Sequence, residues 1–139
     1  MLMGFALILQ PALPESMQSV VTADTSFINP NGQSELARLM REMEAFTKIA
    51  KEDVRTGKNP AGYPVSFDKI YSAALSEGSH KSNFYNAFAD LYLASVKNYA
   101  ASNSGNRVDT YNNMVSACLA CHSQHCPGPV PAIKKMTLE

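Results

Sequence analysis

Apolar residues recur every three or four positions through most of the chain after residue 33, and this spacing constrains the fold more than any other feature. Side chains spaced in this way share one face of an α-helix, whereas a half-buried strand needs strict alternation. The pattern predicts helices over residues 34–56, 67–75 and 82–102, and from 106 to about 124. No alternating run is long enough for a sheet. The chain is therefore expected to be all-α.

The ends and inward faces of these helices can also be predicted. Ser34 and Ser66 are expected N-caps, and Asn106 with Asp109 three residues later is a variant of the capping box. The residues expected on the inward faces are, helix by helix, Leu36, Leu39, Met40, Met43, Phe46, Ile49, Ala50 and Val54; Ile70, Ala73 and Ala74; Phe84, Phe88, Leu91, Tyr92, Ala94, Val96 and Tyr99; and Val108, Tyr111, Val115, Cys118 and His122. Four such helices joined by short links bury their apolar faces most simply as an antiparallel four-helix bundle.

The length of 139 residues suits one domain. Residues 33–139 are assigned to the bundle domain, with a Pro-rich C-terminal tail from 126 onward that is expected to fold back over the bundle end. Residues 1–32 contain Pro11, Pro14 and Pro30 and read as an extended leader. Twelve basic residues balance twelve acidic ones, so no electrostatic field favours nucleic acid, which is excluded as a partner.

The first ten residues form a short apolar run that resembles the core of a secretory signal without its basic start. It is too short to span a bilayer, which takes about 20 apolar residues. Val21-Thr22-Ala23 offers a cleavage site of small residues. We therefore expect export to the periplasm. The alternative is an apolar arm that packs on the domain or on a partner, and membrane association through the N-terminus is left open.

The sequence Cys118-Leu-Ala-Cys121-His122 carries the chemistry. Two thiols separated by two residues can add to the two vinyl groups of one haem, and the adjacent imidazole can then bind the iron. On a helix the three side chains address one side, because their spacings are i, i+3 and i, i+4. That side continues the apolar stripe of Tyr111 and Val115. We therefore predict one covalently attached haem c inside the bundle, with Cys118 and Cys121 as thioethers and His122 as the proximal iron ligand.

Three alternatives to haem are open. Cys118, Cys121, His125 and Cys126 could hold zinc, but structural zinc sites usually bring together two separate ligand pairs. A dithiol redox couple normally lies at the N-terminus of a helix, where the dipole stabilises the thiolate, and here the motif falls at the C-terminus. The third alternative is a disulfide with one spare thiol. Haem is preferred over all three.

With this motif close to the C-terminus of a four-helix chain, the sequence resembles the class II c-type cytochromes, the cytochrome c′ family. The resemblance covers residues 34–124 but is carried mainly by Cys118, Cys121 and His122. It implies that the first helix faces the distal side of the haem and supplies either a Met ligand or a bulky apolar blocker. Gas-binding members usually have a basic residue four places after the haem His. In this chain that position is Cys126, which counts against the gas-binding subtype.

Met43 and Met40 lie on the inward face of the first helix. Met43, near the middle of the helix where the family's distal residue falls, is the preferred distal iron ligand, and Met40 is the second choice. Both would equally serve as core side chains, because Met fills irregular gaps well. Arg38 stands five residues before Met43 and could contact a haem propionate.

The predicted function is a periplasmic one-electron carrier whose partners are redox proteins of a respiratory chain. No acid–base pair, nucleophile constellation or phosphate loop appears in the sequence, so no enzyme is predicted. The alternative is a five-coordinate protein that binds nitric oxide or carbon monoxide, with Met43 as an apolar lid. A small zinc-binding structural module is a remote third possibility, and a homodimer is left open.

Overall fold

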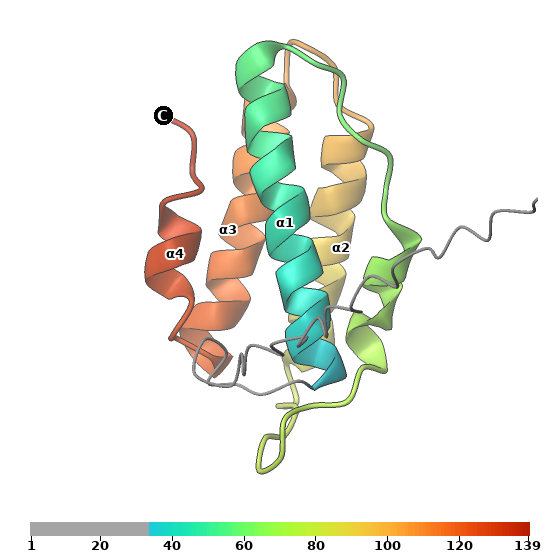
Figure 1. Ribbon diagram of the computed structural model, residues 1–139, viewed down its shortest axis with the longest axis vertical. Coiled ribbons are helices and arrows are strands. Elements are labelled where there is room, and N and C mark those ends of the chain that lie inside the picture. The colour runs from blue at the N-terminus through green and yellow to red at the C-terminus, as the bar shows by residue number, and fades with distance from the viewer. Residues whose placement is uncertain (1–33) are drawn as a thin grey trace, which may run out of the picture.

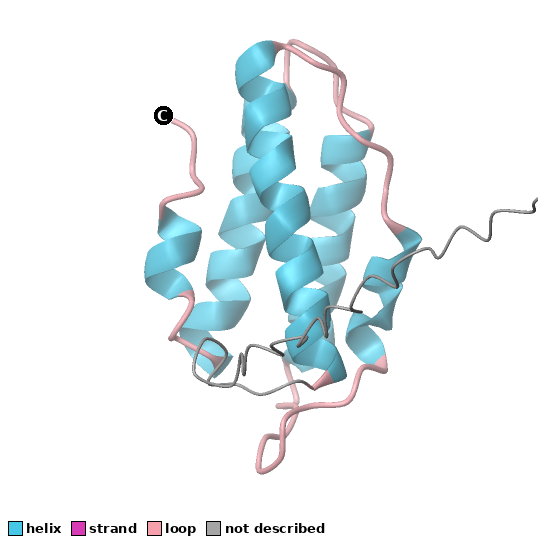
Figure 2. Ribbon diagram, in the orientation of Figure 1, coloured by secondary structure: helices cyan, strands magenta, loops and turns pink. Residues whose placement is uncertain are grey.

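All regular elements between residues 34 and 139, the part of the chain that the computed structural model describes, are helical (Figure 2). They are, in order, the α-helix α1 (Glu35–Thr56), the 3-10 helix η2 (Val65–Tyr71), and the α-helices α2 (Tyr85–Ala100), α3 (Arg107–His125) and α4 (Val130–Lys134). The predicted all-α class is confirmed for these residues. The predicted leader, residues 1–32, lies outside them.

The three long helices lie side by side, and successive elements run in opposite directions along the molecule (Figure 1). The backbone of α3 packs against α2, α1 and α4, and η2 packs against α1 and α2. No Cα atom of α1 lies within 8 Å of a Cα atom of α2. The backbones of these two helices therefore stand apart, and only side chains can occupy the space between them.

The ends of α1 follow from its sequence. The hydroxyl of Ser34 accepts a hydrogen bond of 3.1 Å from the backbone N–H of Ala37, which confirms the predicted N-cap. At the other end Gly57 adopts φ 71° and ψ 13°, a left-handed conformation that costs glycine little. Its backbone N–H bonds to the carbonyls of Asp53 and Val54 and so terminates the helix.

The predicted second helix, residues 67–75 with Ser66 as its cap, is wrong in type and extent. The structure has the 3-10 helix η2, which Pro64 precedes and which ends at Tyr71. The backbone beyond it is bonded to the start of α1 instead of continuing the helix. The N–H of Ala74 donates to the Glu35 carboxylate at 3.0 Å, and the carbonyl of Ala74 accepts from the N–H of Leu36 at 3.0 Å.

Several residues predicted to face inward are exposed, with Ile49 at 60% and Phe84 at 71% the clearest cases. The others are Ala74, Leu91, Ala94 and Val108. The buried face of α2 consists of Tyr85, Ala89, Tyr92, Leu93, Ser95, Val96 and Tyr99. Both Phe84 and Tyr85 fit a three–four spacing, so the spacing does not decide which of them faces the core. The predicted face began at Phe84, one position before the buried face that the structure shows.

The predicted capping box at the start of α3 is also wrong. Asn106 occupies the N-cap position, but its side chain makes no bond to the helix. Its amide oxygen accepts a hydrogen bond of 3.0 Å from the backbone N–H of Asn103. The Asn106 side chain thus stabilises the turn between α2 and α3. Its amide oxygen is then used in this bond and does not cap the first turn of α3.

The C-terminal tail folds back along the bundle and contains the short helix α4 (Figure 1). Lys51 of α1 donates to the carbonyls of Lys135 and Thr137 at 2.8 and 3.2 Å. On α3, the buried Tyr111 hydroxyl donates to the carbonyl of Met136 at 2.8 Å. The predicted folding back is confirmed, although the tail runs beside α1 and α3 rather than over the end of the bundle.

Replacing Tyr111 with phenylalanine should lower the free energy of unfolding by about 1–2 kcal/mol. The change removes a buried hydrogen bond and leaves the Met136 carbonyl without its partner. Tyr71→Phe is the matched control, because it removes a hydroxyl that bonds to Asp90 at the surface. Its effect should stay below about 0.5 kcal/mol. Urea unfolding followed by circular dichroism measures both, and equal effects would contradict the assigned role of the Tyr111 bond.

Candidate functional site

A partly open cavity of about 410 Å³ lies between α1, η2, α2, α3 and α4, and the loop over residues 75–80 forms part of its wall. Its volume falls within the range of roughly 300–1,000 Å³ typical of sites for small molecules and cofactors. Most of its walls are apolar, with Leu36, Ile70, Phe88, Val115 and Ile133 among them. The cavity therefore suits a largely apolar occupant that is held by a few polar groups.

The three residues of the Cys-x-x-Cys-His motif all line this cavity. Cys118, Cys121 and His122 come from the last two turns of α3, and each side chain is half-buried. Burial, reinforced by the neighbouring Cys121, raises the pKa of the Cys118 thiol to about 12. Burial and the proximity of Cys126 raise the pKa of Cys121 as well. Both thiols thus stay protonated at neutral pH, which disfavours the thiolate-based redox couple.

The imidazole of His122 is oriented by the backbone at the end of α3. Its Nδ1 atom lies 3.1 Å from the carbonyl oxygen of Cys126. Because a carbonyl oxygen only accepts, Nδ1 carries the proton in this contact. In the neutral ring the lone pair is then on Nε2. Histidines that bind a metal through one nitrogen commonly donate the other N–H to a carbonyl in this way, which fixes both tautomer and ring orientation.

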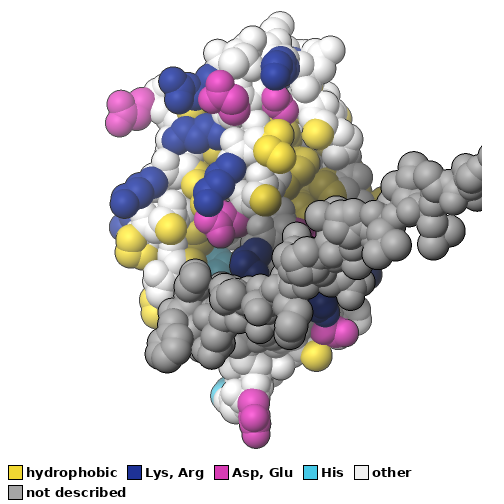
Figure 3. Space-filling model, viewed as in Figure 1, with side chains coloured by type: hydrophobic (Ala, Val, Ile, Leu, Met, Phe, Trp, Pro, Cys, Tyr) yellow, Lys and Arg dark blue, Asp and Glu magenta, His cyan; other side chains and the backbone are white. Residues whose placement is uncertain are grey.

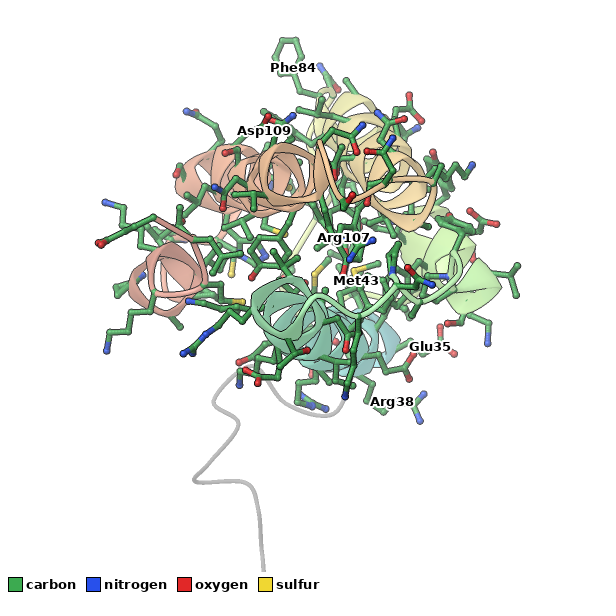
Figure 4. The ribbon with its side chains drawn as sticks, turned by 90° about the horizontal axis from the view of Figure 1, so that it is seen from above. Glu35, Arg38, Met43, Phe84, Arg107 and Asp109 are labelled. Carbon is green, nitrogen blue, oxygen red and sulfur yellow. The ribbon has the colours of Figure 1, made fainter. Side chains whose placement is uncertain are left out.

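Both candidate methionines, Met40 and Met43, also line the cavity, from α1. Met43 is only 5% exposed and points toward the middle of the bundle in the view from above (Figure 4). Met40 is half-buried and packs at the edge of the core. The structure thus brings thioether sulfurs and the motif into the same cavity, as the position of the first helix predicts.

Tyr92 of α2 is a further cavity residue with unusual surroundings. Its hydroxyl oxygen is buried and makes only a weak contact with the Thr47 side chain, without full hydrogen-bond geometry. Burial raises the pKa of Tyr92 well above its ordinary value, so the group is neutral across the physiological range. A buried hydroxyl with so weak a hydrogen bond is costly, and a polar edge of a molecule in the cavity would reduce that cost.

Arg38 does not line the cavity, and its side chain is exposed and points away from the bundle (Figure 4). The cavity is lined instead by Arg41, which is half-buried and makes no ion pair or hydrogen bond with the described residues. Glu44, the acidic residue nearby on the cavity wall, is paired with Lys48 at 2.6 Å. Arg41 is absent from the inward face that the sequence predicts for this helix.

His125 and Cys126 complete the end of the cavity beside the motif. His125 Nδ1 lies 3.2 Å from the carbonyl of Cys121, its Nε2 contacts the Ser82 hydroxyl, and its ring packs edge-on against Phe88. These contacts hold the loop before α2 against the end of α3. His125 is the last residue of α3, and its side chain is exposed.

Between residues 34 and 139, no three His, Cys, Asp or Glu side chains are arranged to hold a metal ion. Cys118, Cys121, His125 and Cys126, the residues of the zinc alternative, form no such group. A haem iron needs only one or two ligands from the protein, so the donors on the cavity wall fit a haem.

None of the helices described here combines the length and apolar character needed to cross a membrane. In comparisons with known proteins, no protein-family model, no curated protein and no solved structure matches the chain.

Proposed function

We propose that this protein is a monohaem c-type cytochrome of the class II kind and carries single electrons in the periplasm. Cys118 and Cys121 would hold the haem covalently, and His122 would bind its iron. A haem held there supplies reversible one-electron chemistry, while the protein sets the iron ligands, the burial and the access of partners. The protein would exchange electrons with redox proteins of a respiratory chain and would not act as an enzyme.

The orientation of His122 carries the proposal. Its Nδ1 is held by the Cys126 carbonyl, which leaves Nε2 available, and it shares one cavity with two cysteines at thioether spacing. A core histidine without a ligand role needs no such juxtaposition. The largely apolar cavity and the weakly bonded, buried Tyr92 hydroxyl support a large, mostly apolar cofactor with a polar edge.

The same proposal includes the finer architecture and the sixth iron ligand. The helices α1, α2 and α3 would provide three members of an antiparallel four-helix bundle, and η2 would stand in the place of the second, shortened helix. Met43 would be the distal ligand, because it combines burial with a place on the cavity wall. A Met ligand favours reduced iron and so suits a carrier that accepts and donates electrons.

An absorption spectrum of the purified protein in the oxidised, reduced and carbon-monoxide-treated states tests this function. We expect a red protein whose colour survives acid–acetone extraction, with a low-spin spectrum in both oxidation states and no change with carbon monoxide. A colourless protein would overturn the proposal altogether. A high-spin ferrous form that binds carbon monoxide rapidly would instead establish the five-coordinate gas-binding alternative.

Arg41 is expected to raise the reduction potential, because it brings a positive charge to the cavity wall that no acidic residue between positions 34 and 139 neutralises. Arg41→Gln should therefore lower the potential by tens of millivolts, which corresponds to a charge interaction of about one to two kcal/mol in a partly screened environment. The guanidinium is also placed to bond a haem propionate, the role that the sequence suggested for Arg38. A redox titration of the wild type and of Arg41→Gln measures the effect.

Arg38→Gln is the matched control for this change. Arg38 is exposed and does not line the cavity, so water and salt screen its charge. Its replacement should shift the potential by less than a third of the Arg41 effect at physiological ionic strength. A larger shift in Arg38→Gln than in Arg41→Gln would reverse the assignment of the two arginines.

A further inference from the structure

A second hollow lies on the outer surface where the start of α2 meets the end of α3. We call it the α2/α3 groove. Its lining residues are Ser82, Phe84, Ala87 and Phe88 on one side and Ala120, Ser123, Gln124 and His125 on the other. Phe84 is 71% exposed and points away from the bundle on the side opposite α1 (Figure 4). An exposed aromatic side chain beside a hollow can serve as the anchor of a protein interface.

The groove is separated from the internal cavity by two side chains. Phe88 and His125 line both the cavity and the groove, and their rings pack edge-on with centroids 5.4 Å apart. On this side only the thickness of these rings separates the cavity from the groove. Electron transfer slows exponentially with distance, so a partner seated in the groove would lie at a favourable point for exchange with a cofactor in the cavity.

The groove is also uncharged. None of its lining residues is Asp, Glu, Lys or Arg, and no such residue occurs anywhere between positions 110 and 133. The face over α1 and α4 differs, since basic and acidic side chains gather there (Figure 3). Electrostatic complementarity therefore favours a partner whose contact surface is itself uncharged and apolar.

We infer that the α2/α3 groove is the docking surface for a redox protein with an uncharged, apolar patch over its own redox centre, and that Phe84 anchors it. This inference rests on the proposed function as an electron carrier. Beyond that function, it names the place where the electron leaves the molecule and the kind of partner surface that receives it. Because neither surface carries charge, the association rate should depend only weakly on salt.

The test uses a blue-copper protein with an uncharged apolar patch over its copper as the probe. One electron passes from the reduced chain to copper(II), which leaves the oxidised chain and copper(I), with no proton transferred. Stopped-flow absorbance measures the second-order rate constant. We expect the wild-type rate to change less than twofold between low and high salt, and Phe84→Asp to lower it at least tenfold.

Val65→Asp is the matched control, because Val65 is 77% exposed and belongs to η2 rather than to the groove. Its rate should stay within twofold of the wild type. Phe84→Asp is expected to fold normally, since Phe84 occupies the N-cap position of α2, where Asp is favoured. Circular dichroism, the absorption spectrum and the reduction potential should be the same in both variants.

Equal rates in the two variants, or a strong salt dependence of the wild type, would overturn the inference. So would sedimentation showing a wild-type dimer that Phe84→Asp dissociates, because the groove would then bind a second copy. These outcomes differ from failure of the proposed function itself. A chain without haem, or with a carbon-monoxide-binding haem, is recognised from its spectrum before any rate is measured.

Discussion

Replacing both Cys118 and Cys121 with serine is expected to abolish covalent haem attachment completely. Serine preserves the size of the side chain but its hydroxyl does not form the thioether that each thiol would contribute. The two thiols line the same cavity from successive turns of one helix, so they would reach the same macrocycle. Expression together with a c-type haem attachment system, followed by haem staining after denaturing electrophoresis and by intact mass, measures the loss.

Cys126→Ser is the control that makes this result specific. Cys126 also lines the cavity, but it is exposed and lies beyond the last turn of α3. Its thiol is not part of the thioether pair, so the variant should retain one covalent haem per chain. Loss of haem in Cys126→Ser, or retention of covalent haem in the double variant, would contradict the assigned attachment sites.

The part of the site that could be predicted from the sequence depends on local helix geometry. The spacing of Cys118, Cys121 and His122 places them on one side of any α-helix, and Tyr111 and Val115 continue that side inward. The structure buries both of these residues and brings the motif to one cavity. Helix geometry is independent of the rest of the fold, which is why the common face of these residues could be predicted. Their role in holding a haem stays a prediction.

The parts that could not be predicted depend on contacts between distant segments. Tyr85 rather than Phe84 faces the core because its hydroxyl donates to the carbonyl of Ile70, fifteen positions earlier. The bonds of Ala74 to Glu35 and Leu36 likewise end η2 from a helix far away in the sequence. Spacing within one segment carries no information about such partners.

The choice between Arg38 and Arg41 shows the same limit on a smaller scale. Both belong to α1, and a rotation of the helix about its axis decides which of them meets the cavity. That rotation is set by how α1 packs on α3 and by the bonds from Lys51 to the C-terminal tail. The signal available in the sequence was Ala37, four residues before Arg41, whose small side chain also lines the cavity.

Replacing Met43 with leucine is expected to change the iron from low-spin to high-spin. Leucine conserves most of the volume of the buried side chain, so the cost in stability should stay below about 1.5 kcal/mol. It removes the sulfur, and with it the proposed sixth ligand. The reduction potential should fall by on the order of 0.1 V, a fraction of the roughly 0.8 V over which axial ligands set haem potentials. Absorption spectra and a redox titration measure both effects.

Met40→Leu is the matched control, because both methionines line the cavity from the same helix. Met43 lies in the core, at 5% exposure, whereas Met40 is half-buried at its edge. If Met43 is the ligand, Met40→Leu keeps the low-spin spectrum, and the ferrous form of Met43→Leu alone gains the ability to bind carbon monoxide. The reverse pattern would assign the ligand to Met40. Low-spin spectra in both variants would exclude either methionine and direct attention to another donor on the cavity wall.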